Sequence, residues 1–255
     1  MAVGTRVFTR AVKKFIRRKL NERGYYYVRG LGNEISTIEE FKQRAHGIMQ
    51  RARQQDEEVV AKLREKYAQP IIGEVSVHRL LELLAQVVDP SNFYLYCGSQ
   101  LIHTLQILES MERAGINEKT DPEMIVATLI HDLGKLALLK GELPEHVEGG
   151  GKRPLREHEP GIGLDNGTFT WDHSDIVHAR FKPYVSAEIA WLLRYHSIST
   201  ACEPLMNDRD RALYERYYKT FVRHDRTYVF YHLPAKRLED YRDILERSFP
   251  ERILF

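Results

Sequence analysis

Six side chains of metal-binding types, spread from position 103 to position 225, are the feature of this sequence with the clearest chemistry. Imidazole and carboxylate groups are ligands for borderline and hard transition metals. Six of them are more than one ion needs and suit two ions. An aspartate has two oxygens and can bridge two ions, whereas a neutral imidazole offers one lone pair. The candidates are His103, His131, Asp132, His173, His196 and Asp225.

The surroundings of these side chains favour metal binding over an ordinary core role. His103 lies in an apolar stretch, the His131–Asp132 doublet ends the run MIVATLI, and His196 ends another apolar segment. Polar groups at the end of a buried helix are costly unless something compensates them, and a metal does so. Adjacent residues on a helix point about 100° apart. His131 can therefore cap one ion while Asp132 bridges two.

Helical periodicity dominates the chain that must position these residues, so we expect an all-α fold. Strand patterns are scarce, and residues 229–233 form the best short candidate. Residues 141–170 are rich in Gly, Pro and charge, which predicts a long loop over the site that is either a functional lid or disordered. The predicted helices are 36–67, 76–88, 99–114, 122–139, 171–180, 185–197, 208–224 and 235–248.

Composition bounds the class of protein. The 255 residues suit one large domain or a domain with an extension, and 43% hydrophobic residues allow a sizeable core. Only Cys97 and Cys202 are present, which argues against a disulfide-stapled secreted fold and fits a reducing, cytoplasmic setting. No apolar run approaches the roughly 20 residues that span a bilayer. We do not expect a nucleic-acid partner.

The N-terminal segment differs in charge from the rest of the chain. Residues 1–24 carry eight lysines and arginines against Glu22 alone, with apolar residues at helical spacing. We therefore divide the chain into a basic N-terminal extension, 1–35, and a main domain, 36–255. The extension fits a helix that packs on the body or on a second copy, a contact with an anionic surface, or a transit peptide.

The order H…HD…H…H…D resembles the HD-domain superfamily, whose core is a metal-binding helical bundle. The finer resemblance is to the myo-inositol oxygenase family and covers about residues 40–255. It is carried by HTLQILESMERAG, LIHDLGK, GIGLDNGTFTWDHSD and LLRYHSIS, together with IMQRARQQDEEVVAKLREKYAQ and the SFPERILF tail. The resemblance implies a diiron oxygenase built on an HD-domain bundle, with a dinuclear metal site beneath the Gly/Pro-rich lid loop.

The resemblance also implies a cofactor and residue roles. Two iron ions, mixed-valent Fe(II)/Fe(III), would use O2 as co-substrate to oxidise a polyol with C–C bond cleavage to a uronic acid-type product. His103, His131 and Asp132 would hold one iron, and His173, His196 and Asp225 would complete the centre, with Asp132 bridging. Asp132 and Lys135 are the implied catalytic residues. The implied substrate contacts are Lys135, Ser197 and Arg29.

Two departures from the family pattern leave the substrate open. Val229 stands where the family has a lysine, and the EGGGK segment at 148–152 has no clear partner for a family aspartate. Another polyol, or a hydroxylated substrate such as a phosphonate, fits these changes.

Two other functions compete with the oxygenase. An HD-domain phosphohydrolase acting on nucleotides or phosphate esters would use the same ligands to activate water, with Lys152, Arg153 and Arg156 at the phosphates. A non-enzymatic binding or regulatory protein would act through the basic extension. The two additional histidines and the oxygenase-like flanks favour the diiron oxygenase.

Overall fold

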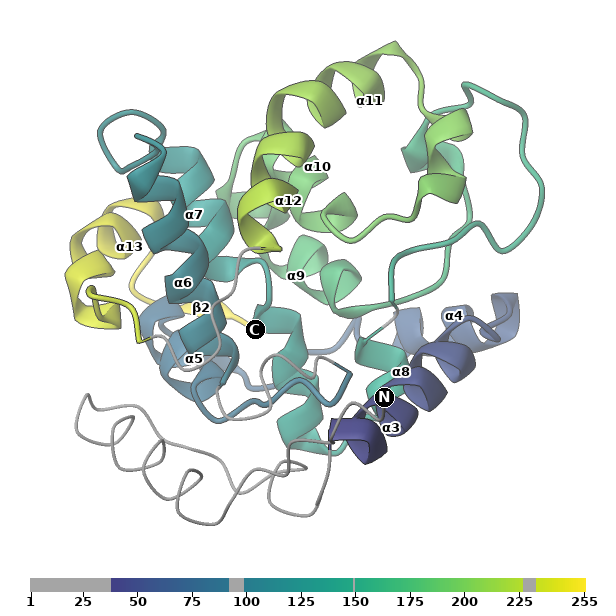
Figure 1. Cartoon of the computed structure of the whole chain (residues 1–255), viewed down its shortest axis with the longest axis horizontal. Helices are drawn as coiled ribbons and strands as arrows, with labels where there is room; N and C mark the ends of the chain where they lie inside the picture. Colours follow the sequence, from purple (N-terminus) through teal and green to yellow (C-terminus); the bar gives the residue numbers. More distant parts are fainter. Residues whose placement is uncertain (1–37, 92–98, 149, 227–232) are drawn as a thin grey trace, which may run out of the picture.

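A computed structural model describes residues 38–91, 99–148, 150–226 and 233–255. This part of the chain is mainly helical, so the prediction of an all-α fold is confirmed (Figure 1). The basic extension 1–35 with Arg29, and Val229 with nearly all of the candidate strand 229–233, lie outside the described residues. No helix in the described ranges is long and apolar enough to cross a membrane.

The described part of the chain is a succession of helices joined by turns and loops. The α-helices are α3 Ile38–Ala52, α4 Glu57–Lys66, α5 Val77–Leu84, α6 Gln100–Arg113, α7 Pro122–Ile130, α8 Pro144–Val147, α9 His173–Phe181, α10 Ala187–Tyr195, α11 Asp208–Leu213, α12 Lys219–Asp225 and α13 Arg242–Ser248. Shorter 3-10 turns are η2 Leu133–Lys140, η3 Leu164–Asn166, η4 Lys182–Tyr184, η5 Thr200–Leu205 and η7 Leu238–Tyr241, and η6 Tyr214–Tyr218 is a π-helix.

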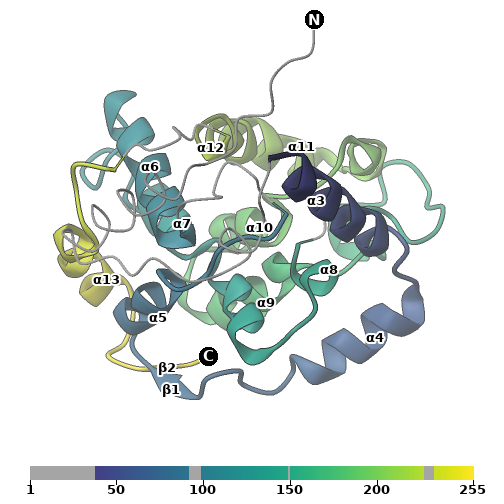
Figure 2. The same cartoon turned by 60° about the horizontal axis from the view of Figure 1, so that its bottom comes forward.

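A two-stranded sheet joins the segment before α5 to the C-terminal segment. The strands β1 Glu74–Val75 and β2 Ile253–Leu254 pair antiparallel, with Val75 opposite Ile253. Figure 2 shows them side by side near the C-terminus. The terminal Phe255 is buried against Phe181, so the end of the chain belongs to the core.

The predicted helix 36–67 is wrong because the chain breaks between α3 and α4. Asp56 caps α4 by accepting a hydrogen bond from the Val59 amide at 2.9 Å. Gln55, just before this cap, accepts from the Trp171 amide at 2.7 Å and donates to the Trp171 carbonyl at 3.1 Å. The break thus lets a buried amide hold the segment that leads into α9.

The predicted helix 122–139 is also wrong, since it divides at the His131–Asp132 doublet. Asp132 has φ −97° and ψ 2°, and the chain continues as the 3-10 turn η2. Gly134 shows why the path changes here: a Cβ on this glycine would lie 2.1 Å from the His173 carbonyl oxygen. Only a glycine allows η2 to approach the start of α9 this closely.

The predicted helix 208–224 is interrupted by a π-helical turn. The turn η6 joins α11 to α12, and the rings of Tyr214 and Tyr218 stack with centroids 4.5 Å apart. The predicted loop 141–170 is present, but it has structure of its own. It carries α8 and η3 and forms bridges from Lys152 to Ile198 and from Pro154 to Phe169.

The core surrounds the doublet. Every residue of α7 from Met124 to Ile130 is buried. α6 packs on α7 and α12, and α9 packs on α10 and η2. The His131 ring contacts Phe221 of α12 edge-on at 5.1 Å. The helices that the sequence predicts to carry the six candidates are therefore the ones that form the core.

We expect Gly134→Ala to disturb both stability and the candidate metal centre. Its methyl group would collide with backbone that cannot rotate away, and overpacking of this kind costs about 1–3 kcal/mol. Gly47→Ala is the matched control, because this helical glycine has only the Arg51 side chain within reach. The control should be neutral or stabilise by about 0.5–1 kcal/mol. Thermal unfolding of both variants tests this, and equal melting temperatures would contradict the close-packing argument.

Candidate metal centre

The structure brings all six predicted ligands together. Two groups of potential ligand atoms each lie within 4.8 Å of one another: His103, His131 and Asp132 form one, and Asp132, His173 and His196 form the other. Asp132 belongs to both groups, as a bridging carboxylate must. That the six bind metal stays a prediction, which their convergence supports.

Asp225 lies with the first group. Its Oδ1 is 3.2 Å from His103 Nε2 and 3.7 Å from His131 Nε2. The sequence analysis grouped Asp225 with His173 and His196, and the structure corrects this grouping. The arrangement is four side chains on one side and three on the other, with Asp132 counted in both.

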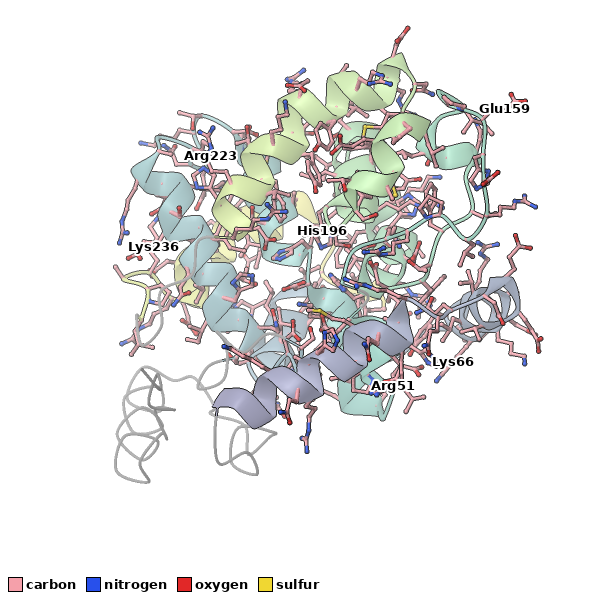
Figure 3. The ribbon with its side chains drawn as sticks, turned by 45° about the vertical axis from the view of Figure 1, so that its right-hand side comes forward. Arg51, Lys66, Glu159, His196, Arg223 and Lys236 are labelled. Atoms are coloured by element: carbon pink, nitrogen blue, oxygen red, sulfur yellow. The ribbon has the colours of Figure 1, made fainter. Side chains whose placement is uncertain are left out.

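Each candidate comes from a different helix end or face. His103 lies on the buried face of α6, and the doublet follows α7 directly. His173 opens α9, His196 caps the C-terminus of α10, and Asp225 ends α12. Figure 3 shows His196 in the interior between the helices, whereas Arg51, Lys66 and Glu159 lie at the periphery.

Backbone carbonyls fix the orientation of three imidazoles. His131 Nδ1 lies 2.7 Å from the Thr128 oxygen, His173 Nδ1 2.8 Å from that of Val147, and His196 Nδ1 2.9 Å from that of Leu193. A carbonyl can only accept, so each Nδ1 carries the hydrogen. The lone pair of each neutral ring is then on Nε2, which points into the cluster, and this is how ligand histidines are commonly held.

The unsatisfied atoms of the cluster fit a metal. The Nε2 atoms of His173 and His196 are 3.1 Å apart, so two lone pairs face each other unless a proton or a cation intervenes. Asp132 Oδ2 and His131 Nε2 are buried 3.3 Å from each other, and neither atom makes a well-formed hydrogen bond to another described residue. Burying such groups uncompensated is unfavourable. Imidazole nitrogens and carboxylate oxygens together form a donor set suited to iron.

The pKa values of His173 and His196 are shifted in opposite directions. Burial lowers the pKa of His196 to about 3, helped by the nearby His173 and His131. Burial also opposes charge on His173, but its bond to Asp132 prevails and raises that pKa to about 9. In the metal-free protein a proton on His173 thus relieves the lone-pair conflict. Metal binding would have to displace that proton.

Lys135 lies next to the cluster, among three buried carboxylates. Its Nζ is 3.0 Å from Asp89 Oδ2, 3.3 Å from Asp132 Oδ1 and 3.5 Å from Glu148 Oε2. Burial opposes its charge, yet the carboxylates of Asp132 and Asp89 hold its pKa well above the usual value. Lys135 is therefore a charged hydrogen-bond donor beside the candidate metal ligands.

The sequence analysis left Asp89 unassigned and missed Glu148. Asp89 directly follows the predicted helix 76–88, and its buried side chain also accepts two hydrogen bonds from Ser91. Glu148 stood in the lid loop, and burial with the charge of Asp89 raises its pKa to about 8 against the pull of Lys135. The sequence signal for Glu148 is its position as an acidic residue directly before the glycine run of EGGGK.

A cavity of about 370 Å³ opens above these groups. Its walls include Lys135, Glu148, Ser197 and all six candidate ligands. This volume lies in the range of small-molecule sites, about 300–1,000 Å³. Ser197 donates to Asp172 Oδ2 at 2.9 Å, so its oxygen is held at the cavity wall with lone pairs left to accept.

One of the three lid cations considered for a phosphate site is engaged elsewhere. Lys152 is fully buried, and its ammonium pairs with Asp172 and Asp175. Arg156 faces Glu57 on the surface at 3.6 Å. Lys152, the buried cation of the three proposed for phosphates, is thus committed to carboxylates of α9 and its cap, which weakens the phosphohydrolase alternative.

Comparison with known proteins points in one direction. The family model described as "Myo-inositol oxygenase" matches residues 41–151. "Inositol oxygenase 2" of Arabidopsis thaliana is 28% identical over 228 residues, covering 72% of this chain and 68% of the relative. "Inositol oxygenase 1" of the same plant is 29% identical over 192 residues, 60% of each chain. "Probable inositol oxygenase" of Oryza sativa subsp. japonica is 25% identical over 263 residues, 85% of this chain and 80% of the relative.

We expect His196→Ala to lose one of two metal ions. The change removes a ligand atom from the second group only, so elemental analysis should fall from about two ions to about one per chain. His46→Ala is the control, because His46 is an exposed residue of α3. Unchanged metal content in His196→Ala, with a normal melting temperature, would remove His196 from the ligand set.

Proposed function

We propose that this chain is a member of the myo-inositol oxygenase family, and that it is an oxygenase with two iron ions that uses O2 to oxidise a polyol. The reaction would cleave a C–C bond and yield a uronic acid-type product, as the sequence resemblance implies. The observation that carries the proposal is the pair of ligand groups sharing Asp132 beneath a cavity that contains Lys135.

The chain offers ligands for both ions. His103, His131 and Asp225 would hold one, His173 and His196 the other, and Asp132 would serve both. Bound iron would act as a Lewis acid that lowers the pKa of a coordinated hydroxyl and would supply the redox chemistry with O2. The carbonyl bonds to Nδ1 keep the rings of His131, His173 and His196 turned toward this centre.

Lys135 would bind and orient the substrate. An ammonium has three donors, and Lys135 hydrogen-bonds to Asp89 while lying against Asp132. The third donor faces Glu148 Oε2 at 3.5 Å, a long contact that a substrate oxygen in the cavity would replace. The charged form, which the surrounding carboxylates favour, would stabilise negative charge that develops on that oxygen.

Ser197 would contact a second substrate hydroxyl. Its own hydrogen is engaged by Asp172, which also accepts from the Ser174 amide at 2.9 Å and from Lys152 at 3.1 Å. Asp172 thereby fixes the Ser197 oxygen as an acceptor. A donor at Lys135 and an acceptor at Ser197 suit a molecule with several hydroxyl groups.

The direct test measures metal and oxygen use together. Protein reconstituted with Fe(II) without air should hold about two ions per chain and give a mixed-valent EPR signal after partial oxidation. Addition of myo-inositol should change this signal and start O2 uptake. Hydrolysis of phosphate esters with Mn²⁺ or Mg²⁺, and no O2 uptake with any polyol, would overturn the proposal in favour of the phosphohydrolase.

Lys135→Ala should separate metal binding from substrate binding. Both ions should remain, whereas the KM for the polyol should rise about tenfold to a hundredfold, because a charge-assisted hydrogen bond is lost. Lys140→Ala is the control, since Lys140 is an exposed lysine on the same turn η2. An unchanged KM in Lys135→Ala would remove this lysine from substrate binding.

A further inference from the structure

A second, larger cavity adjoins the one above the candidate centre. It has a volume of about 660 Å³ and is lined by η5, η6 and α12. The two cavities share His196, Ser197, Asp225, Arg226 and the glycines 150–151 of the lid loop. We call the larger one the outer cleft and the smaller one the inner cavity. A ligand in the inner cavity can thus extend into the outer cleft past residues common to both.

One wall of the outer cleft is a basic face of α12. Lys219, Arg223 and Arg226 follow at intervals of four and three residues, so they share one side of the helix, and all three line the cleft. Arg226 comes directly after the candidate ligand Asp225 and also lines the inner cavity. Of the three cations, Arg226 is therefore the one that adjoins the candidate metal centre.

Two acidic residues line the same cleft as these three cations. The acids among the described residues that line the cleft are Glu203 and Asp225, and Asp225 is turned toward His103 and His131. Glu215 pairs with Lys219 at 2.6 Å, but both side chains are more than half exposed. Exposed pairs of this kind are weak and exchange readily for another anion.

The π-helical turn explains how the basic face comes to line the cleft. A π-turn inserts one extra residue into a helix and so rotates the next helical segment by about 100°. Here η6 precedes α12 directly, and the stacked Tyr214 and Tyr218 lie in the same wall. Such turns occur frequently at functional sites.

We propose that the basic face of α12 binds a phosphate group carried by the substrate. This rests on the proposed function, because the inner cavity is taken as the site of the polyol hydroxyls. A phosphate monoester carries close to two negative charges near neutral pH. The planar guanidinium of arginine matches its oxygens in a two-point contact. The substrate class is therefore a phosphorylated polyol, whose hydroxyls enter the inner cavity while the phosphate stays in the outer cleft.

The test compares two probes on the iron-loaded full chain. The probes are myo-inositol and myo-inositol 1-phosphate, and both turnover and calorimetric binding are measured. We expect the phosphate ester to have the higher kcat/KM, and this preference to fall as salt is raised. Arg226→Gln should reduce affinity for the ester about tenfold, and Arg223→Gln/Arg226→Gln should reduce it further. Arg64→Gln, an exposed arginine of α4, is the charge-matched control and should change neither probe.

Each outcome decides a different statement. Turnover of myo-inositol with no binding of the ester would reject the phosphate site and leave the oxygenase in place. No turnover of either probe by protein that holds both metals would reject the oxygenase. Calorimetry would then still decide the phosphate site by whether Arg226→Gln weakens binding of the ester. Equal losses of affinity for the ester in Arg226→Gln and Arg64→Gln would mean that only the net charge of the chain matters, which would overturn the proposal.

Discussion

The burial of the Asp132 carboxylate is the constraint on which the rest of this structure depends. The residue is 2% exposed, and its oxygens lie 3.2–3.3 Å from His131, His173 and Lys135. A buried carboxylate without such partners costs several kcal/mol. Its three partners come from the end of α7, the start of α9 and the turn η2. The packing of these elements therefore places the side chains that compensate the buried charge of Asp132.

The same arrangement leaves the metal-free cluster in conflict. The carbonyl bonds that fix the imidazole rings also direct the lone pairs of His173 and His196 at each other. A proton on His173 resolves this only in part, because His196 and the doublet remain buried beside it. A ligand that binds only the folded state stabilises that state. A bound cation would therefore contribute to the stability of these helices as well as to chemistry.

The sequence marks these six side chains as candidates because most of their signal is local. The doublet and His196 end apolar helical segments, and His103 lies within one, and such segments are easily recognised. The helix breaks have no local signal in the sequence. The apolar pattern through 122–139 stays periodic across the doublet, and the change of path there goes with the close approach of Gly134 to His173 in the fold. Asp89 and Glu148 are not recognised in the sequence for the same reason. Their importance comes from Lys135, which is 46 residues from Asp89 in the chain and 3.0 Å away in the fold.

Metal binding and substrate recognition are carried by different parts of the chain. The candidate ligands occupy the buried ends and faces of five core helices, where a change of one side chain disturbs packing and charge together. Other groups in and next to the two cavities lie on the turn at Asp89, on the lid loop at Glu148 and on the basic face of α12. Of these, the exposed cations of α12 can change with little effect on packing, whereas Asp89 and Glu148 are buried against Lys135. The inner cavity, with two further carboxylates around one lysine, and the basic outer cleft together favour a substrate with hydroxyls at one end and negative charge at the other.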